Sequence, residues 1–421
     1  MVKRVFLSRF SGFFKALGPG IIFAGTSIGV SHIVHSTRAG AIYGFTLLGL
    51  VVLINILKYP FFEFGPRYVT ATQENLLLGY KRLGNWAFNL YLLLAFATMF
   101  PIQASVTMVS TGLLVNLLGW AYPPVYLAAI ILLVCAVVLI IGKYPLFDKT
   151  MKLMMVVLAV STISAFAMAI ESRRGHSVAM CGQFVWDLPG ISFLVVLMGW
   201  MPSTIDISVW HSFWSCERIK QTKYVPTMKE TLCDFHFGYW LTMIMAVFFL
   251  GLGALVMFKS GEVFSNSAVT FTGQVISLYT KALGQWSFPV IATAATVTMF
   301  STSLSCFDAY TRIVREASVI IFPQTKDKAD TIYLIWMIVL AVVSTLIIGK
   351  FINQLKTFVD FATTLSFLAA PVFAYINYRT VTSEHMPVTA RPGKILRILS
   401  WIGIIFLSFF GVLYLISKIF L

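Results

Sequence analysis

The amino-acid sequence predicts an all-α polytopic membrane protein that forms one membrane domain over residues 1–421. Hydrophobic residues make up 58% of the chain and charged residues 11%, less than half of the roughly 25% usual in soluble domains. The apolar residues form long runs, such as 41–57, 125–141 and 401–417, with almost no ionisable side chains. A run of about 17 to 20 residues matches a ~30 Å hydrocarbon core, and backbone amides in lipid need internal partners, so these runs must be helices.

The apolar runs and the polar segments between them predict eleven spans along the chain. In order they are 14–36, 42–65, 87–116, 121–142, 151–171, 188–213, 236–258, 286–309, 331–349, 352–378 and 396–418.

The basic residues predict the orientation of these spans. The chain carries 31 Lys and Arg against 16 Asp and Glu, a net charge of +15. With the N-terminus inside, 22 basic residues fall in inner segments and 8 in outer ones, and Lys58 lies near the inner end of its span. Because cytoplasmic loops retain Lys and Arg, this bias indicates topology and not a nucleic-acid partner. We therefore expect an integral protein of a bacterial inner membrane with a cytoplasmic N-terminus and, for eleven spans, an external C-terminus.

Other motifs exclude several classes of protein. The five cysteines are scattered without a C-x-x-C pair, which predicts neither a zinc site nor a disulfide framework. Residues 1–17 are basic and lead directly into a span, as expected for a retained cytoplasmic tail. Neither a phosphate-binding loop nor a nucleophile–base pair stands out, so we expect no ATP-driven pump, no enzyme and no organic cofactor.

Two spans carry matching interruptions. The first opens with Pro19-Gly20 and the sixth with Pro189-Gly190, and each then enters a segment rich in Gly, Pro and hydroxyl residues, 25–32 and 199–204. Gly and Pro weaken the helical hydrogen-bond ladder, although both are common in membrane helices. Interrupted helices at corresponding positions of two halves are typical of a transporter's binding site. We predict inverted five-helix repeats over 14–171 and 188–378, an extra helix over 396–418, and a secondary transporter with a midplane site.

The first interruption supplies small residues and hydroxyl groups. Free amides at the start of a half-helix favour a carboxylate, and free carbonyls at the end of one favour a cation, so a small polar or zwitterionic solute would fit. Close helix packing is the alternative explanation for the small residues. The candidate substrate-binding residues here are Gly25, Thr26, Ser27, Gly29, Ser31 and His32.

The second interruption adds an acidic residue at membrane depth. Asp206 is a functional candidate because ionisable groups inside a membrane are costly. It also fits a capping box in which Ser203 caps the restarting helix. Trp200 could gate the site or simply pack. The candidate substrate-binding residues here are Gly199, Trp200, Ser203, Thr204 and Asp206.

Histidines and a second aspartate are candidates for a proton pathway. Imidazole titrates near neutral pH, so His32, His35 and His211 could carry protons or could serve as interhelical hydrogen-bonding groups. Asp360 precedes a hydroxyl stripe that could line the path or join helices. Asp308 lies four residues before Arg312 and is expected to pair with it.

Several segments resemble the Nramp family of proton-coupled divalent-metal transporters. Leu17-Gly18-Pro19-Gly20 is similar to the opening motif of that family, 39–45 to its Gly-Gly-Ala-x-Tyr-Gly-Tyr segment, Gly65 and 71–83 to the loop after the second span, and His211-Ser212 to a His-Ser pair of the sixth span. The resemblance implies the LeuT-type fold: eleven or twelve helices in a 5+5 inverted repeat, with the first and sixth helices unwound.

The metal-binding chemistry of that family does not carry over. Its Asp-Pro-Gly-Asn motif aligns with Gly29-Val30-Ser31-His32, which contains no carboxylate. Its Met-Pro-His motif is similar to Met201-Pro202-Ser203, which contains no histidine. The Asp and Glu of its third span align with Gln103 and Val106, which adds Gln103 to the substrate-binding candidates. Because a dication needs strong ligands to leave water, we predict a remodelled site for a small polar solute.

Proton coupling is expected through His32 or Asp206, with His211 and Asp360 as further members of the pathway. Two alternatives remain open: a divalent-cation transporter that uses His32, Asp206 and backbone carbonyls, and a non-transporting membrane receptor. The expected partners are the lipid bilayer and a small-molecule or ion substrate, and the protein could be a monomer or a homo-oligomer.

Overall fold

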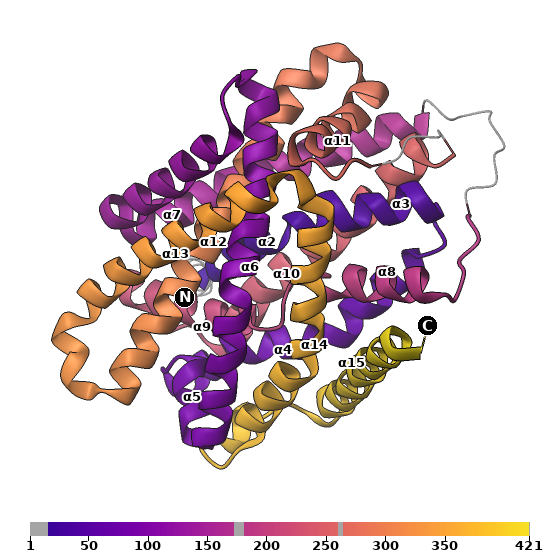
Figure 1. Cartoon of the computed structure of the whole chain (residues 1–421). Coiled ribbons are helices and arrows are strands. Elements are labelled where there is room, and N and C mark those ends of the chain that lie inside the picture. Colours follow the sequence, from indigo (N-terminus) through magenta and orange to yellow (C-terminus); the bar gives the residue numbers. More distant parts are fainter. Residues whose placement is uncertain (1–15, 172–180, 260–263, 421) are drawn as a thin grey trace, which may run out of the picture.

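The computed structural model describes residues 16–171, 181–259 and 264–420, and these are almost entirely helical. Figure 1 shows α2, α6, α10 and α12 grouped at the centre, with α11 and α15 toward the periphery. The helices are α2 (Pro19–Ser27), α3 (Thr37–Tyr43), α4 (Leu48–Thr72), α5 (Leu76–Leu83), α6 (Asn85–Leu118), α7 (Pro124–Glu171), α8 (Leu188–Gly199), α9 (Ile207–Thr222), α10 (Met228–Leu252), α11 (Ala268–Leu283), α12 (Phe288–Ile321), α13 (Ala329–Phe351), α14 (Leu355–Thr382) and α15 (Lys394–Phe420). Two π-helical turns, η1 (Ser31–Ser36) and η2 (Gly253–Met257), adjoin α3 and α10.

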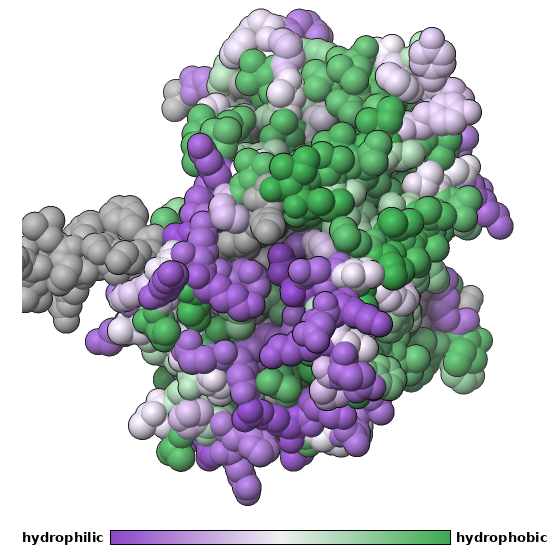
Figure 2. Space-filling model, turned by 90° about the vertical axis from the view of Figure 1, so that its left-hand side faces the viewer, coloured by the Kyte–Doolittle hydropathy of each residue, from purple (hydrophilic) through white to green (hydrophobic). Residues whose placement is uncertain are grey.

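The described residues contain eight helical stretches long and apolar enough to cross a membrane. The stretch Pro323–Thr382 joins α13 and α14, whereas the two interrupted spans are not among the eight. Large apolar side chains of α7, such as Ile141 (78% exposed) and Leu153 (68% exposed), point away from the protein. Figure 2 shows a face on which hydrophobic side chains cover a broad area beside a hydrophilic one. This distribution confirms an integral membrane protein, because lipid replaces protein as the partner of the outward apolar side chains.

Glycines allow the first span to lie directly on α10. A Cβ on Gly238 of α10 would lie 1.9 Å from the carbonyl oxygen of Gly20 in α2, and a Cβ on Gly20 would lie 2.1 Å from the carbonyl oxygen of Asp234. On the far side of the interruption, a Cβ on Gly40 of α3 would lie 1.9 Å from the Leu250 carbonyl oxygen. Both halves of the first span are therefore packed backbone to backbone on α10, as small residues permit in membranes.

The first span is longer than predicted. It continues through η1 and α3 to Tyr43, where Gly44 adopts a positive φ of 61°, and the second span begins at Leu48 instead of residue 42. The predicted end at residue 36 rested on Arg38 lying in a loop. Arg38 is instead buried within α3, because Asp360 of α14 accepts hydrogen bonds from both of its terminal nitrogens.

Further boundaries also differ from the predicted ones. The predicted loop around residues 143–150 lies inside α7, which contains Pro145. The segment between the seventh and eighth predicted spans contains α11, which is too short to cross the membrane and packs its Phe271 and Val275 side into the core. The sequence of such a helix contains no long apolar run, because one of its faces is polar. The number of spans and the division into inverted repeats stay predictions.

Candidate substrate site between the two interrupted helices

The first interruption lies where the sequence predicts it. Ile28 leaves helical geometry with ψ 77°, its N–H still bonds to the Ala24 carbonyl, and the chain resumes as η1 at Ser31. Most of the freed groups nearby are satisfied locally. The Ser27 carbonyl accepts the Gly29 N–H at 2.9 Å, and the Gly25 carbonyl accepts the Thr302 hydroxyl at 3.3 Å.

The second interruption lies between α8 and α9, where residues 200–206 form a non-helical linker of bends and turns with a cis Met201–Pro202 bond. The two interruptions touch, because the Ser31 hydroxyl lies 3.3 Å from the Pro202 carbonyl oxygen. Both spans therefore lose helical geometry, as predicted, and they do so at positions that face each other.

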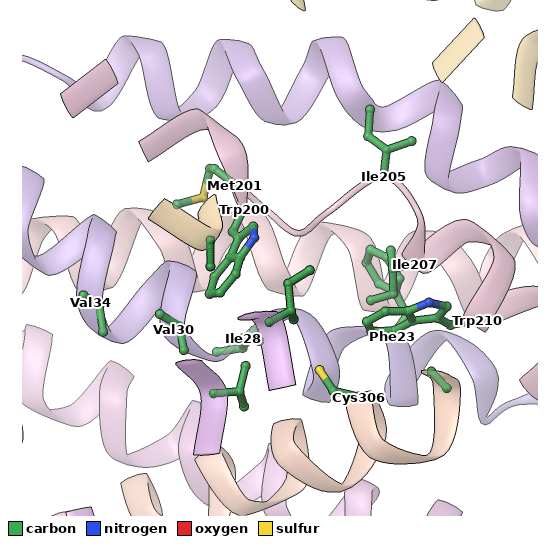
Figure 3. Close-up of a cluster of buried hydrophobic side chains, with 14 of the residues drawn as sticks. Phe23, Ile28, Val30, Val34, Trp200, Met201, Ile205, Ile207, Trp210 and Cys306 are labelled. Carbon is green, nitrogen blue, oxygen red and sulfur yellow. The ribbon is translucent and has the colours of Figure 1, made fainter. Parts of the chain in front are cut away.

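A small cavity of about 30 Å³ lies between the two interruptions, with room for about two water molecules. Figure 3 shows Val30 of the first interruption and Trp200 of the second on facing sides of this region, with Cys306 of α12 below them. The lining residues, which define the central pocket, are Thr26, Ser27, Val30, Ser31, Ile102, Val106, Trp200, Ser203, Thr204, Trp210, Thr302 and Cys306.

The central pocket offers hydroxyl groups, indole rings and one thiol, and none of its lining side chains is a carboxylate, imidazole or amine. Two of its polar groups, the Ser27 hydroxyl and the Trp210 indole N–H, are buried and have no hydrogen-bond partner among the described residues. Such groups are costly unless they bind something. The pocket is thus suited to a polar, hydrogen-bonding molecule that carries no multiple charge.

Three predicted glycines lie outside the pocket lining and serve close packing instead. A Cβ on Gly25 would lie 2.6 Å from Cε of Met151, one on Gly29 would lie 2.8 Å from the Thr302 hydroxyl, and one on Gly199 would lie 2.4 Å from the Thr363 carbonyl oxygen. The packing explanation of these small residues fits the structure.

His32 and Gln103 do not line the pocket. His32 lies fully buried between the Ser31 hydroxyl, 2.6 Å from Nδ1, and the Thr242 carbonyl, 2.9 Å from Nε2. Gln103 donates from its amide nitrogen to the Thr107 hydroxyl and the Ser303 carbonyl. Both side chains therefore connect helices.

Asp206 is buried immediately before α9, and neither of its carboxylate oxygens accepts a hydrogen bond of normal geometry, although the Thr204 and Tyr310 hydroxyls and the N–H groups of Asp206 and Ile207 lie nearby. The predicted capping box is wrong: α9 begins at Ile207, so Asp206 occupies the cap position itself, and its side chain makes no capping bond. The titratable side chains that face Asp206 are Tyr80, Tyr91, Cys306 and Tyr310, none of which is a cation.

The other proton-pathway candidates are dispersed. His211 packs against Phe23 and Phe235, and its ring nitrogens, like those of His35, lack partners among the described residues. Asp308 bonds Arg312 at 2.8 Å, as predicted.

Asp360 lies in a separate, larger cavity of about 490 Å³, which we call the vestibule. Its charged lining residues are three cations and one carboxylate: Arg38, Lys356, Lys418 and Asp360. The Arg38–Asp360 pair, with a shortest N···O distance of 2.7 Å, joins α3 to α14 across the vestibule.

Sequence reasoning did not select six of the lining residues, and it also did not select Lys58. The six are Val30, Ile102, Val106, Trp210, Thr302 and Cys306. The hydroxyl residues Thr298 and Thr302 recur four positions apart in an apolar span, a signal that could have identified α12. Lys58, a lone charge inside an apolar run, lies in the middle of α4 and is fully buried, not near the end of its span. A cluster of three or more His, Cys, Asp or Glu that could hold a metal is absent from the described residues.

The chain resembles several solved transporters along most of its length. A manganese transporter of Eremococcus coleocola superimposes with a TM-score of 0.67 at 16% identity, covering 96% of this chain and 87% of that one. MhsT in complex with L-phenylalanine superimposes with a TM-score of 0.60 at 14% identity, covering 93% and 98%. Two interrupted helices around a central pocket, together with these similarities, define a membrane protein of the LeuT-type transporter fold.

The family is shown by sequence. The family model described as natural resistance-associated macrophage protein-like, or Nramp, matches residues 20–417. An uncharacterized protein of Pasteurella multocida is 36% identical over 413 residues, covering 96% of this chain and 93% of that protein. The chain therefore belongs to the Nramp family, as its sequence motifs predict.

Proposed function

We propose that this protein is a secondary transporter that carries a small polar organic solute through the central pocket by alternating access. The observation that supports the proposal most directly is the pocket lining, which combines hydroxyl and indole groups with no carboxylate, imidazole or amine side chain. The free Ser27 hydroxyl and Trp210 N–H provide hydrogen bonds, and the faces of Trp200 and Trp210 provide apolar contact.

A bare dication is poorly matched to these surroundings. Such an ion needs anionic or strongly donating ligands in exchange for its hydration shell, and the only sulfur in the lining is the buried thiol of Cys306. The vestibule adds an excess of two positive charges, three minus one, which repels cations and attracts carboxylates. A zwitterion or a small carboxylate-bearing solute is therefore the class we propose.

We propose that transport is proton-coupled through Asp206. A buried carboxyl group that lacks a cationic partner can take up and release a proton as cargo passes, whereas His32 is held by two hydrogen bonds.

For the orientation, we propose a cytoplasmic N-terminus in a bacterial inner membrane.

Divalent-metal transport is the second candidate. Membership of the Nramp family favours it, as does the similarity to the manganese transporter of Eremococcus coleocola. The buried carboxylate of Asp206 and the thiol of Cys306 would supply its side-chain ligands, and both would have to turn toward one ion.

Proteoliposome uptake separates these candidates. Vesicles with and without an inside-alkaline gradient are tested against a library of labelled zwitterions and carboxylates and, separately, against Mn²⁺. We expect gradient-driven uptake of an organic solute and no Mn²⁺ uptake above that of empty vesicles. Uptake of Mn²⁺ alone would establish the second candidate, and uptake of nothing would favour a receptor without transport activity.

A Ser27→Ala variant tests whether uptake passes through the central pocket. Removing the unpartnered hydroxyl should raise KM for the solute severalfold, because that group is free to bind cargo. Ser36→Ala is the matched control, since the Ser36 hydroxyl is also buried and unpartnered but does not line the pocket. Equal effects of the two substitutions would contradict the proposed site.

A further inference from the structure

Lys58 contacts the broken end of α8. This residue lies in α4 with none of its surface exposed, and its Nζ donates to the carbonyl oxygens of Met198 at 2.6 Å, Gly199 at 3.0 Å and Ser203 at 3.4 Å. The first two carbonyls end α8, and the third belongs to the linker beyond it. Three carbonyl groups from both sides of the interruption thus converge on one nitrogen, and we call them the carbonyl cradle.

The cradle has the chemistry of a cation site. The last carbonyls of a helix lack intrahelical partners and carry a share of the helix dipole, about −0.5 charge at this end. Inside a membrane these carbonyls need partners from the protein, water or a bound ion, and a cation or an ammonium group can satisfy several of them at once. Interrupted membrane helices commonly bind cations through such carbonyls.

The number of donors indicates which form of Lys58 occupies the cradle. An ammonium group has three donors and no acceptor, and here it meets three acceptors, whereas a neutral amine would leave one carbonyl without a proton. Lys58 forms no ion pair with any described carboxylate, so backbone carbonyls alone surround its charge. A site made only of neutral carbonyl groups offsets the desolvation of a monovalent cation far better than that of a divalent cation.

We propose that the Lys58 ammonium is a built-in substitute for a monovalent cation, and that the carbonyl cradle binds such an ion when this side chain is shortened. The inference concerns a site other than the central pocket and does not depend on which solute is carried. Its consequence is that the wild-type protein needs no external monovalent cation to hold the end of α8.

Thermal unfolding of purified full-length protein in detergent tests the proposal. Lys58→Ala is compared with wild type in choline, sodium, potassium and ammonium chloride at equal ionic strength. We expect the midpoint of Lys58→Ala to be low in choline and to rise saturably with ammonium or an alkali cation, and the wild-type midpoint to be the same in all four salts. A Lys58→Ala midpoint that ignores every cation would overturn the proposal, as would an equal response in wild type.

Two controls restrict the effect to the cradle. Lys58→Met fills the same space with an apolar chain and should be destabilised without any rescue by cations. Lys350→Ala removes an exposed lysine and should behave as wild type. Cation rescue in either control would show that the response arises elsewhere.

A measurement on wild-type protein covers the case in which Lys58→Ala does not fold. In protein labelled with [15N]lysine, the slowly exchanging Nζ resonance expected for this buried side chain should couple to three protons. Coupling to two protons, or the absence of a protected lysine signal, would contradict an ammonium in the cradle. None of these measurements depends on uptake. A failure of the transport proposal can therefore be distinguished from a failure of the proposal for the carbonyl cradle.

Discussion

Ser31 is the residue that joins the two interruptions. Its hydroxyl lies 2.9 Å from the Ser27 carbonyl, 3.3 Å from the Pro202 carbonyl and 2.6 Å from Nδ1 of His32. A hydroxyl has one proton and can donate to one of these acceptors at a time. Ser31 therefore can exchange partners between the first interruption, the second interruption and a histidine as the two segments move.

A Ser31→Ala substitution should slow uptake more than it destabilises the protein. The lost hydrogen bond is expected to cost about 0.5–1.5 kcal/mol of stability, whereas uptake depends on the link between the two moving segments. Thermal unfolding and proteoliposome uptake measure the two effects. A stability loss with unchanged uptake would show that the link is merely structural.

Asp206→Asn should separate stability from proton coupling. The substitution keeps the shape of the side chain but removes a buried charge that has no cationic partner among the described residues, so the unfolding midpoint should stay level or rise. Gradient-driven uptake should be lost, while equilibrium exchange of solute across the membrane continues. Loss of both activities in a stable variant would instead place Asp206 among the groups that bind cargo.

The sequence predicts the chemistry of the site better than the direction of each side chain. Thr26, Ser27 and Ser31 line the pocket, and the Thr26 and Ser31 hydroxyls also bond to backbone carbonyls four residues earlier. Gly29 occupies the same segment and instead allows contact with Thr302. Whether a small residue faces cargo or a neighbouring helix depends on helix rotation, which is set by tertiary packing and not by local composition.

At the scale of elements, interruptions are easier to predict than helix ends. The glycines of segment 25–32 and Pro202 of segment 199–204 indicate the interruptions through backbone chemistry alone. The true end of the first span depends on Arg38 finding Asp360, which lies 322 residues away in the sequence. A basic residue is assigned to a loop from the sequence when the carboxylate that pairs with it in the fold is not known.

The crossing of α2 and α10 predicts a sharp difference between two glycines. Gly238→Ala should destabilise the protein by about 1–3 kcal/mol, because its Cβ would lie 1.9 Å from a backbone oxygen that cannot simply rotate away. Gly49→Ala, in a helix position with no atom within 4 Å of the added methyl group, should be neutral or stabilising by up to about 1 kcal/mol. Denaturation in detergent measures both; equal effects would contradict the close crossing.

At the scale of the whole molecule, polar contacts tie both ends of the first span to neighbouring helices. The Arg38–Asp360 pair joins the α3 half of the first span to α14. At the other end of that span, Asp234 of α10 accepts the N–H groups of Gly18 at 3.0 Å and Gly20 at 2.7 Å. The first span is therefore tethered at both ends, and we expect each tether to oppose opening of the pocket on its own side.

Cys306 provides a native probe of this arrangement, because its thiol is buried and lines the central pocket. In a background where the other four cysteines are replaced by alanine, a membrane-impermeant maleimide should label it slowly from either side. Asp360→Asn weakens the tether to Arg38 and should speed labelling from the vestibule side only. Asp234→Asn weakens the hydrogen bonds to the N–H groups of Gly18 and Gly20 at the start of α2 and should speed labelling from the opposite side only. Cargo should protect Cys306 in both variants. If each substitution instead accelerates labelling from both sides, the two tethers stabilise the fold as a whole, and neither acts as a gate for one side of the membrane.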